Sequence, residues 1–419
     1  MLAWDSLHPY NAVHVARVPG TPDVERLRTA IDIAIKQRSI AQIAIDRGRG
    51  EYSCRARGPT PEIVILDCSK GVRESIAEEI GRQLNTPFDL SGTFSPFRFF
   101  VAPGDGFFHL GLSYFHAVAD AESIVRLMKD AVENFTGERR PTESANPGQV
   151  TPAEKGPKRS TPGVWLRKMA EMPSHLANLR RSCRPSYRDV EDLTVGFALI
   201  SVDPKKLSNL MQAAKTWRTT VNDVLLALLI KSCATMAAVR ATGQRNRISV
   251  GCIVNTRKDL AGAARESLGL HLGSFLITQD LPGNLPLVAL ARNISGVTAR
   301  IKDHRVYLAT ALELSAARFL LAFYSTNRQK KLYQKHYPLW GGLTNMNINS
   351  LWPSVSGSEP PEYIRAVSTG PVTPLVLSFT TSGAEANIGL SYRTTVFSQS
   401  DVDDIESFLL NSLTDLDVA

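Results

Sequence analysis

Several patterns that mark common functional classes are missing from this sequence of 419 residues. It contains no glycine-rich phosphate-binding loop of the GxxxxGK[ST] or GxGxxG type and no GxSxG nucleophile elbow. Its five cysteines are scattered and show no CxxC spacing, which predicts free thiols in a reducing compartment and no zinc or other metal site. The sequence therefore gives no support for nucleotide-phosphate, serine-hydrolase or zinc chemistry.

Segments for secretion or membrane insertion are not evident either. The first residues, MLAWDSLHPYN, lack the basic start and apolar core of a signal peptide. The most apolar stretch, 221–239, carries Asp223 and Lys231 and reads as too short and too polar in its middle to span a bilayer. We therefore expect a cytoplasmic protein without a transmembrane segment.

Positive charge is concentrated in one part of the chain. Residues 138–188 hold eleven Lys and Arg against four Glu, a local charge of +7, while the whole chain carries +8. Much of this charge lies in a Pro-, Ser- and Lys-rich stretch without interleaved aromatics, so we expect no nucleic-acid binding. Residues 163–182 predict an interrupted basic amphipathic helix that packs on its own protein through its apolar side, with peripheral membrane or partner contact as the alternative.

The length exceeds that of one ordinary core, which predicts two or more lobes. Both halves mix strands with helices, so the fold class is α/β (α+β), with mixed sheets and flanking helices. We predict an N-terminal lobe over 1–137, a basic Pro-rich linker and helix over 138–190, and a C-terminal lobe over 191–419. The apolar spacing in 21–37 predicts a helix with Thr21 as its cap.

The segment GFFHLGLSYFHAVADAESIVRLM, residues 106–128, carries the candidate chemistry. It changes from a strand to a helix at His116, with Asp120 four residues later, and Gly137 ends the helix. Side chains at strand ends often point into ligand-binding crevices, and a neutral imidazole can accept a proton from a hydroxyl or an amine. A lone histidine beside an apolar helix is, however, more often structural, and one His with one Asp is too few for a metal site.

The motif FHAVADA resembles the HHxxxDG motif of the chloramphenicol acetyltransferase-like superfamily of HxxxD acyltransferases. That group includes peptide-synthetase condensation domains, polyketide-associated acyltransferases and wax ester synthases. Further segments resemble the same group in the same order: VNDVLLALL (221–229), VNTRKDL (254–260), LGSFLITQDLPGN (272–284) and LSFTTSGAEANIGLSYRTTVFSQSDVDDI (377–405). The resemblance covers almost the whole chain.

The resemblance implies two chloramphenicol-acetyltransferase-like lobes with a tunnel between them. It implies an acyltransferase of secondary metabolism that forms an ester or amide, with His116 as general base and no acyl-enzyme. The donor would be a thioester on coenzyme A or on the phosphopantetheine arm of an acyl carrier protein. It would be a substrate rather than a permanently bound cofactor. The acceptor would be a small-molecule alcohol or amine.

The resemblance also suggests roles for other residues. Asp120 would form a structural ion pair with Arg257, at the end of the strand Ile248–Val254, instead of polarising His116 in a relay. Asn345, in LTNMN (343–347), would donate to the oxyanion, although capping of a turn is an equally open role. The basic residues Lys155, Lys158 and Arg159 would help to bind the donor by long-range attraction, and a solvated linker is the alternative.

Two departures from the motif keep a second function open. Phe115 stands where the motif has its first His, and Ala121 stands where it has Gly. The first His varies across the superfamily, so catalysis is not excluded. The alternative is a catalytically inactive condensation-like fold that acts as a binding or recruitment module.

Overall fold

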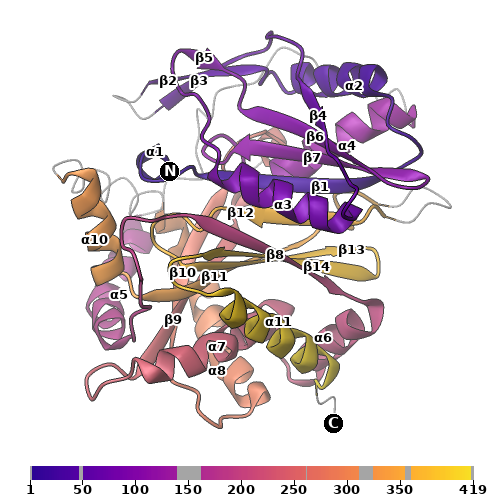
Figure 1. Ribbon diagram of the computed structural model, residues 1–419. Helices are drawn as coiled ribbons and strands as arrows, with labels where there is room; N and C mark the ends of the chain where they lie inside the picture. The colour runs from indigo at the N-terminus through magenta and orange to yellow at the C-terminus, as the bar shows by residue number, and fades with distance from the viewer. Residues whose placement is uncertain are drawn as a thin grey trace.

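The computed structural model describes residues 2–46, 51–138, 162–260, 262–310, 324–353 and 360–416 (Figure 1). Residues 139–161 of the predicted linker and helix lie outside the described residues. The N-terminal elements are α1 (Leu2–Asp5), β1 (Asn11–Pro19), α2 (Val24–Gln37), β2 (Gln42–Asp46), β3 (Glu51–Arg55), β4 (Ile63–Ile65), α3 (Val72–Asn85), β5 (Thr93–Phe94), β6 (Phe97–Pro103), β7 (Phe107–Phe115) and α4 (Ala121–Thr136).

The elements that follow begin with a helix before the second large sheet. They are α5 (Pro162–Arg181), β8 (Val195–Val202), α6 (Pro204–Thr216), α7 (Val221–Val239), β9 (Arg247–Asn255), η1 (Arg257–Asp259), η2 (Gly262–Arg265), β10 (Leu272–Asp280), α8 (Leu287–Asp303), η3 (Val306–Ala309), α10 (Thr326–His336), β11 (Leu339–Asn347), β12 (Tyr363–Val367), β13 (Leu375–Ser382), β14 (Glu385–Arg393) and α11 (Gln399–Thr414).

Two mixed sheets form the centre of the two lobes. The N-terminal sheet has the strand order β12-β1-β7-β6-β4, and the C-terminal sheet has the order β10-β9-β11-β13-β14-β8. A small third sheet, β3-β2-β5, lies at the top of the molecule in Figure 1, beyond the N-terminal sheet. Parallel and antiparallel pairs occur in both large sheets, so the predicted α/β class with mixed sheets is confirmed.

Helices cover the outer faces of the two sheets, and α3 lies between the lobes (Figure 1). The helices α2 and α4 pack on each other over the N-terminal sheet, whereas α6, α7, α8 and α11 pack on the C-terminal sheet. The helix α3 contacts both β1 and β8, which belong to different sheets. Its apolar residues Ile76, Ile80 and Leu84 are fully buried there, so the junction between the lobes is itself a packed core.

One strand from the C-terminal part of the chain crosses to the N-terminal sheet. The predicted boundary at 191 would leave β12 in the C-terminal lobe, but its backbone pairs with β1 along five residues, from Ala12↔Val367 to Ala16↔Tyr363. The same strand also contacts β13 and β14 of the other sheet. The lobes are therefore tied together by main-chain hydrogen bonds as well as by side-chain packing.

The helix α4 places the candidate motif at the start of a buried element. Asp120 is its N-cap, and its carboxylate accepts from the Ser123 N–H at 2.8 Å. Gly137 ends the helix in the left-handed region at φ 80°, which suits glycine. The predicted cap of α2 was wrong, because Asp23 rather than Thr21 accepts from the Arg26 N–H. Only the residue directly before the first helical turn can reach that donor.

The helix α5 differs from the sequence expectation in its packing. It runs from Pro162 to Arg181 without interruption, with Pro173 inside it. Its buried apolar residues are Val164 and Leu179, whereas a larger apolar set is exposed: Trp165, Leu166, Met169 and Leu176. The expectation that the apolar side packs on its own protein was therefore wrong for most of this face.

The helix α7 is long and apolar enough to cross a membrane by length and composition, contrary to the sequence expectation. Ten of its 19 residues are buried, among them Leu225, Leu226 and Leu229 at the centre of the C-terminal core. A buried core helix passes the same test of length and hydropathy. In this fold α7 packs against α8, β9 and β11.

Candidate functional site

His116 follows β7 directly, in the turn that leads to α4. Its backbone N–H donates to the Tyr10 carbonyl at 3.1 Å. The His116 ring stacks on the Tyr10 ring, with 5.2 Å between centroids, and meets the Tyr114 ring nearly at a right angle at 5.5 Å. Only 7% of the residue is exposed. The imidazole is thus held between two aromatic rings with little contact to water.

These surroundings determine the protonation and tautomer of His116. Burial lowers its pKa to about 4 from an ordinary 6.5, with a smaller opposing effect from the hydrogen bond to Ala119. Nδ1 lies 3.0 Å from the Ala119 carbonyl oxygen, which can only accept, so Nδ1 carries the hydrogen. Nε2 then holds the lone pair, and the described residues provide it with no hydrogen-bond partner. A neutral imidazole with an unengaged Nε2 can act as a general base.

Asp120 points away from the His116 ring and into a set of donors. Its Oδ1 and Oδ2 accept from Arg257 Nη2 at 2.8 and 2.9 Å, and Oδ2 also accepts from the His271 N–H at 2.9 Å. Ser123 supplies the capping N–H. Because Asp120 is only 1% exposed, its charge depends on these donors for stabilisation.

Arg257 is buried with Asp120 and is bonded from several sides. Its Nη1 donates to the Arg265 and Ser267 carbonyls at 2.7 and 2.9 Å, and its Nη2 also donates to Ser123 Oγ at 2.6 Å. A second carboxylate, that of Glu122, lies 3.7 Å from Nε. The pair therefore joins the start of α4 to the segment between β9 and β10, across the two lobes.

The structure thus brings Asp120 and Arg257 together, as the resemblance implies. It describes no bond between the Asp120 carboxylate and the His116 ring, whose Nδ1 is taken by the Ala119 carbonyl. The geometry fits a structural ion pair rather than a relay, and the effect of the pair on activity stays a prediction.

The two departures from the motif have clear structural settings. Phe115 is fully buried in an aromatic cluster with Phe88 and Phe94, at 6.1 and 6.0 Å between centroids. Ala121 is the first residue of α4, and its backbone φ is not positive, so this position does not require glycine. Neither substitution removes the turn that holds His116.

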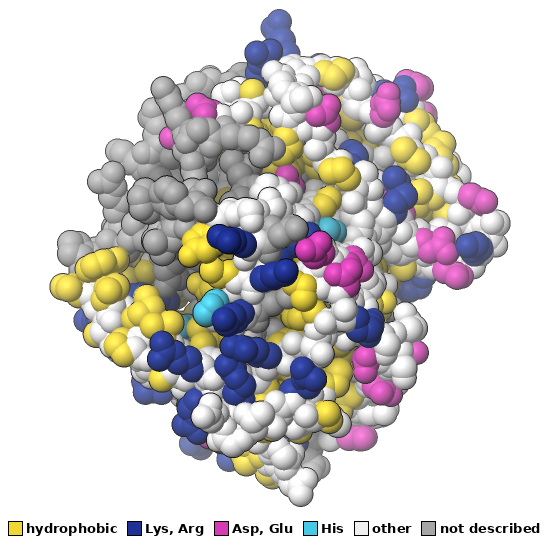
Figure 2. Space-filling view, turned by 60° about the vertical axis from the view of Figure 1, so that its left-hand side comes forward, with side chains coloured by type: hydrophobic (Ala, Val, Ile, Leu, Met, Phe, Trp, Pro, Cys, Tyr) yellow, Lys and Arg dark blue, Asp and Glu magenta, His cyan; other side chains and the backbone are white. Residues whose placement is uncertain are grey.

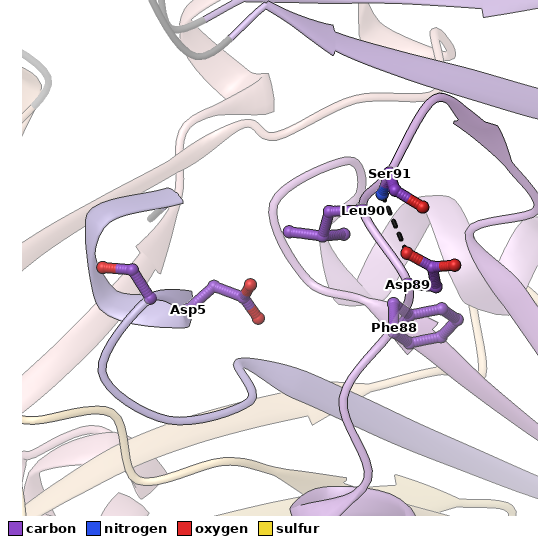
Figure 3. A pocket seen from close by; sticks show the side chains of 6 residues that line it. Asp5, Phe88, Asp89, Leu90 and Ser91 are labelled. Atoms are coloured by element: carbon purple, nitrogen blue, oxygen red, sulfur yellow. Dashed lines mark hydrogen bonds between the residues drawn. The ribbon is translucent and has the colours of Figure 1, made fainter.

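An open pocket of about 560 Å³ adjoins this aromatic cluster (Figure 3). It is lined by Asp5, Ser6, Phe88, Asp89, Leu90 and Ser91. Figure 3 shows the Asp5 side chain on one side and the Phe88–Ser91 loop on the other. Asp5 Oδ1 also accepts from the Tyr10 N–H at 3.0 Å, and the Tyr10 ring stacks on the His116 ring, so on this side one residue separates the pocket lining from His116.

The other predicted site residues are not brought to His116. Asn345 is exposed on β11, and the structure describes no contact between it and His116. Its role as an oxyanion donor stays a prediction. Lys155, Lys158 and Arg159 lie outside the described residues. Within the part of the chain that the structure describes, no group of three His, Cys, Asp or Glu side chains could hold a metal ion.

Sequence reasoning missed several neighbours of the motif. The Ser123 N–H had a local signal, since an Asp directly before a helix typically caps the N–H of the third helical residue. Tyr10 and His271 had none, because their contacts with His116 and Asp120 depend on how distant segments fold together.

Comparisons with known proteins agree with this geometry. The condensation-domain family model matches residues 4–309. No curated protein matches the chain. Among solved structures, the first condensation domain of the CDA synthetase is 14% identical with a TM-score of 0.67, over 99% of this chain and 93% of that chain.

Two further structures show the same architecture. The EpoB cyclization-docking bidomain from Sorangium cellulosum is 14% identical with a TM-score of 0.70, over 97% of this chain and 79% of that chain. A chain from the complex of the X-domain and OxyB from teicoplanin biosynthesis is 14% identical with a TM-score of 0.60, over 100% and 94%. These likenesses establish the two-lobed fold. Because the family match spans most of the sequence, the resemblance to the chloramphenicol acetyltransferase-like superfamily is confirmed, and the chain belongs to the condensation-domain family.

Proposed function

We propose that this protein is an acyltransferase that moves an acyl group from a thioester to an alcohol or an amine. The observation that carries the proposal is His116: buried, neutral at pH 7, anchored through Nδ1 and without a described partner on Nε2. As the acceptor attacks the thioester carbonyl, Nε2 would take the proton from its O–H or N–H. The tetrahedral intermediate would then release the thiolate, which receives from His116 the proton that the acceptor gave up.

The donor in this proposal is carried by coenzyme A or by the phosphopantetheine arm of a carrier protein. Both bear phosphate, and carrier proteins are usually acidic, which suits the positive charge of residues 138–188. In Figure 2 the side of the molecule that carries α5 and α10 in Figure 1 comes forward. This face shows exposed hydrophobic side chains beside many Lys and Arg. We propose that a carrier protein docks on this face, and peripheral membrane contact through α5 remains the alternative. We also propose that the protein is located in the cytoplasm.

We propose that the acceptor enters by the pocket beside Phe88. Its lining combines apolar side chains with the carboxylates of Asp5 and Asp89, and Asp5 contacts Tyr10, whose ring stacks on the His116 ring. The tunnel implied by the resemblance would continue from this pocket toward the ring.

A recruitment module without catalysis is the second candidate function. Phe115 in place of the first motif His favours it, as does the likeness to the chain from the X-domain–OxyB complex. An intact His116, Asp120 and Arg257 favour catalysis, since a module that only binds has no need of a neutral buried imidazole.

The two functions are separated by one experiment. The protein is incubated with a panel of acyl-coenzyme A and acyl-carrier-protein thioesters, with and without a mixture of alcohols and amines. Free thiol is measured with a colorimetric reagent, and products are identified by mass spectrometry. Acceptor-dependent thiol release supports the acyltransferase. Tight carrier-protein binding without thiol release for any donor would instead support the recruitment module.

A further inference from the structure

Polar side chains other than His116 are buried at the same junction. They lie on three adjacent strands of the N-terminal sheet, and all are at least 97% buried: His14 on β1, Tyr114 on β7, and Tyr363 and Arg365 on β12. Burial of polar groups is unfavourable unless each finds a hydrogen-bond partner.

Three of these four side chains are bonded within the fold. His14 Nδ1 lies 2.8 Å from the Tyr363 hydroxyl. Arg365 donates to Thr380 Oγ1 and to the Phe379 carbonyl, both at 2.8 Å. The Arg365 bonds hold the crossing strand β12 against the C-terminal sheet, and the His14–Tyr363 bond joins it to β1.

The Tyr114 hydroxyl is the exception. It is fully buried, and it has no hydrogen-bond partner among the described residues. Its ring nevertheless packs well, against the His14 ring at 5.6 Å and the His116 ring at 5.5 Å. A phenylalanine would make the same ring contacts without leaving a buried polar group unsatisfied. The hydroxyl is therefore not explained by packing.

The electrostatic setting of Tyr114 suits a donor to a negative charge. Burial raises the pKa of its hydroxyl, so the proton is retained at any physiological pH. Arg365 acts on both Tyr114 and His116 as a nearby positive charge, and it forms no ion pair with a carboxylate within the described part of the chain. A buried cation without a carboxylate partner favours negative charge that develops beside it.

We propose that the Tyr114 hydroxyl is the hydrogen-bond donor to the acyl oxygen that becomes negatively charged during transfer. The inference rests on the proposed function, since it concerns the same reaction. As the acceptor's lone pair forms the new bond to the carbonyl carbon, the π electrons move to that oxygen and His116 takes the acceptor's proton. When the C=O bond reforms, the C–S bond breaks and the thiolate takes up the acceptor's proton from His116. Tyr114 keeps its own proton throughout.

This role differs from the one assigned by sequence to Asn345. Asn345 is exposed on β11, whereas Tyr114 is two residues from His116 and shielded from water. A shielded donor stabilises an oxyanion more strongly than one in water, because the local dielectric is lower.

The substitution Tyr114→Phe tests the proposal, because it removes only the hydroxyl. We expect kcat for thioester consumption to fall by about 10²–10³-fold with little change in donor KM. The melting temperature should stay the same or rise, since no described hydrogen bond is lost. The matched control is Tyr392→Phe in the C-terminal lobe, which loses a bond from its hydroxyl to Gln399 at 3.2 Å and should keep wild-type kcat.

Each outcome decides the inference. A fall in kcat with an unchanged melting temperature and unchanged KM supports it. Wild-type kcat in Tyr114→Phe overturns it while the proposed function stands, provided that the unsubstituted protein and Tyr392→Phe are active. A lowered melting temperature with proportionate loss of activity assigns the hydroxyl a structural role and also overturns it. Absence of thioester consumption by the unsubstituted protein overturns the proposed function and the inference together.

Discussion

Removing either charge of the Asp120–Arg257 pair should destabilise the whole protein. Both side chains are at most 5% exposed, and the two Nη2–carboxylate contacts are 2.8 and 2.9 Å. Loss of one member leaves the other charge buried, which typically costs about 3–5 kcal/mol. With an unfolding entropy of about 2.1 cal/mol/K per residue over this length, the melting temperature should fall by about 3–6 °C.

The variants can be chosen so that the cap and the charge are separated. Asp120→Asn keeps a good cap for the Ser123 N–H but removes the negative charge, whereas Asp120→Ala removes both. Asp120→Ala should therefore lose about 0.5–2 kcal/mol more than Asp120→Asn. Arg257→Met removes the cation with little change in volume and leaves Asp120 with only backbone donors.

A partly exposed ion pair within the N-terminal lobe provides the control. Arg38 and Asp130 are 2.6 Å apart, and each side chain is 20% exposed. Arg38→Met should cost no more than about 1 kcal/mol. Differential scanning calorimetry gives the melting temperatures of the four single variants. The double variant Asp120→Asn with Arg257→Met then gives the coupling energy between the two residues.

Two results would refute this reasoning. Melting temperatures of Asp120→Asn and Arg257→Met equal to that of Arg38→Met would show that the buried pair does not support the fold. Loss of activity in Asp120→Asn, with stability intact, would instead restore the relay between Asp120 and His116.

The site and the charge distribution lead to four further predictions. Burial lowers the folded-state pKa of His116 to about 4, so kcat/KM at pH 5.5 should stay near its value at pH 7, whereas an ordinary histidine would be about 90% protonated there. The same shift makes folding stability fall as pH drops from about 6.5 toward 4, because the unfolded state binds that proton more readily. Raising the salt concentration should raise donor KM if Lys155, Lys158 and Arg159 attract the donor, since exposed charges are screened beyond about 10 Å at 0.1 M, and a KM indifferent to salt would leave them a linker role. Ser91→Trp should narrow the pocket and raise acceptor KM without changing donor KM. The control is Ser69→Trp, because Ser69 is exposed and its N–H donates to Asp67 as the Ser91 N–H donates to Asp89. Ser69→Trp should change neither acceptor KM nor donor KM.

Local sequence patterns predicted the elements that carry the motif. The change from strand to helix at His116 predicted β7, and helical spacing after Asp120 predicted α4 with its end at Gly137. The location of Arg257 at the end of a strand followed from the resemblance, and the structure places it against Asp120. Such features depend on neighbouring residues or on a motif, and both are visible in one sequence.

Features that depend on distant pairing were not predictable in this way. The strand β12 joins β1 across more than three hundred residues, and no local pattern specifies that partner. Arg365 reaches the surroundings of His116 only because β12 crosses to this sheet, whereas Tyr10 reaches the ring through the pairing of β1 with β7. The exposed apolar face of α5 was also missed, because helical periodicity identifies an apolar side without identifying what covers it.

The most direct test of the central claim is thiol release by His116→Ala. With an active donor and acceptor pair, the account predicts that turnover falls by about 10²–10⁴-fold while the protein remains folded. The measurement is a continuous thiol assay on the unsubstituted protein and on His116→Ala, with circular dichroism of both. Turnover of His116→Ala equal to that of the unsubstituted protein would contradict the role of His116 as the general base.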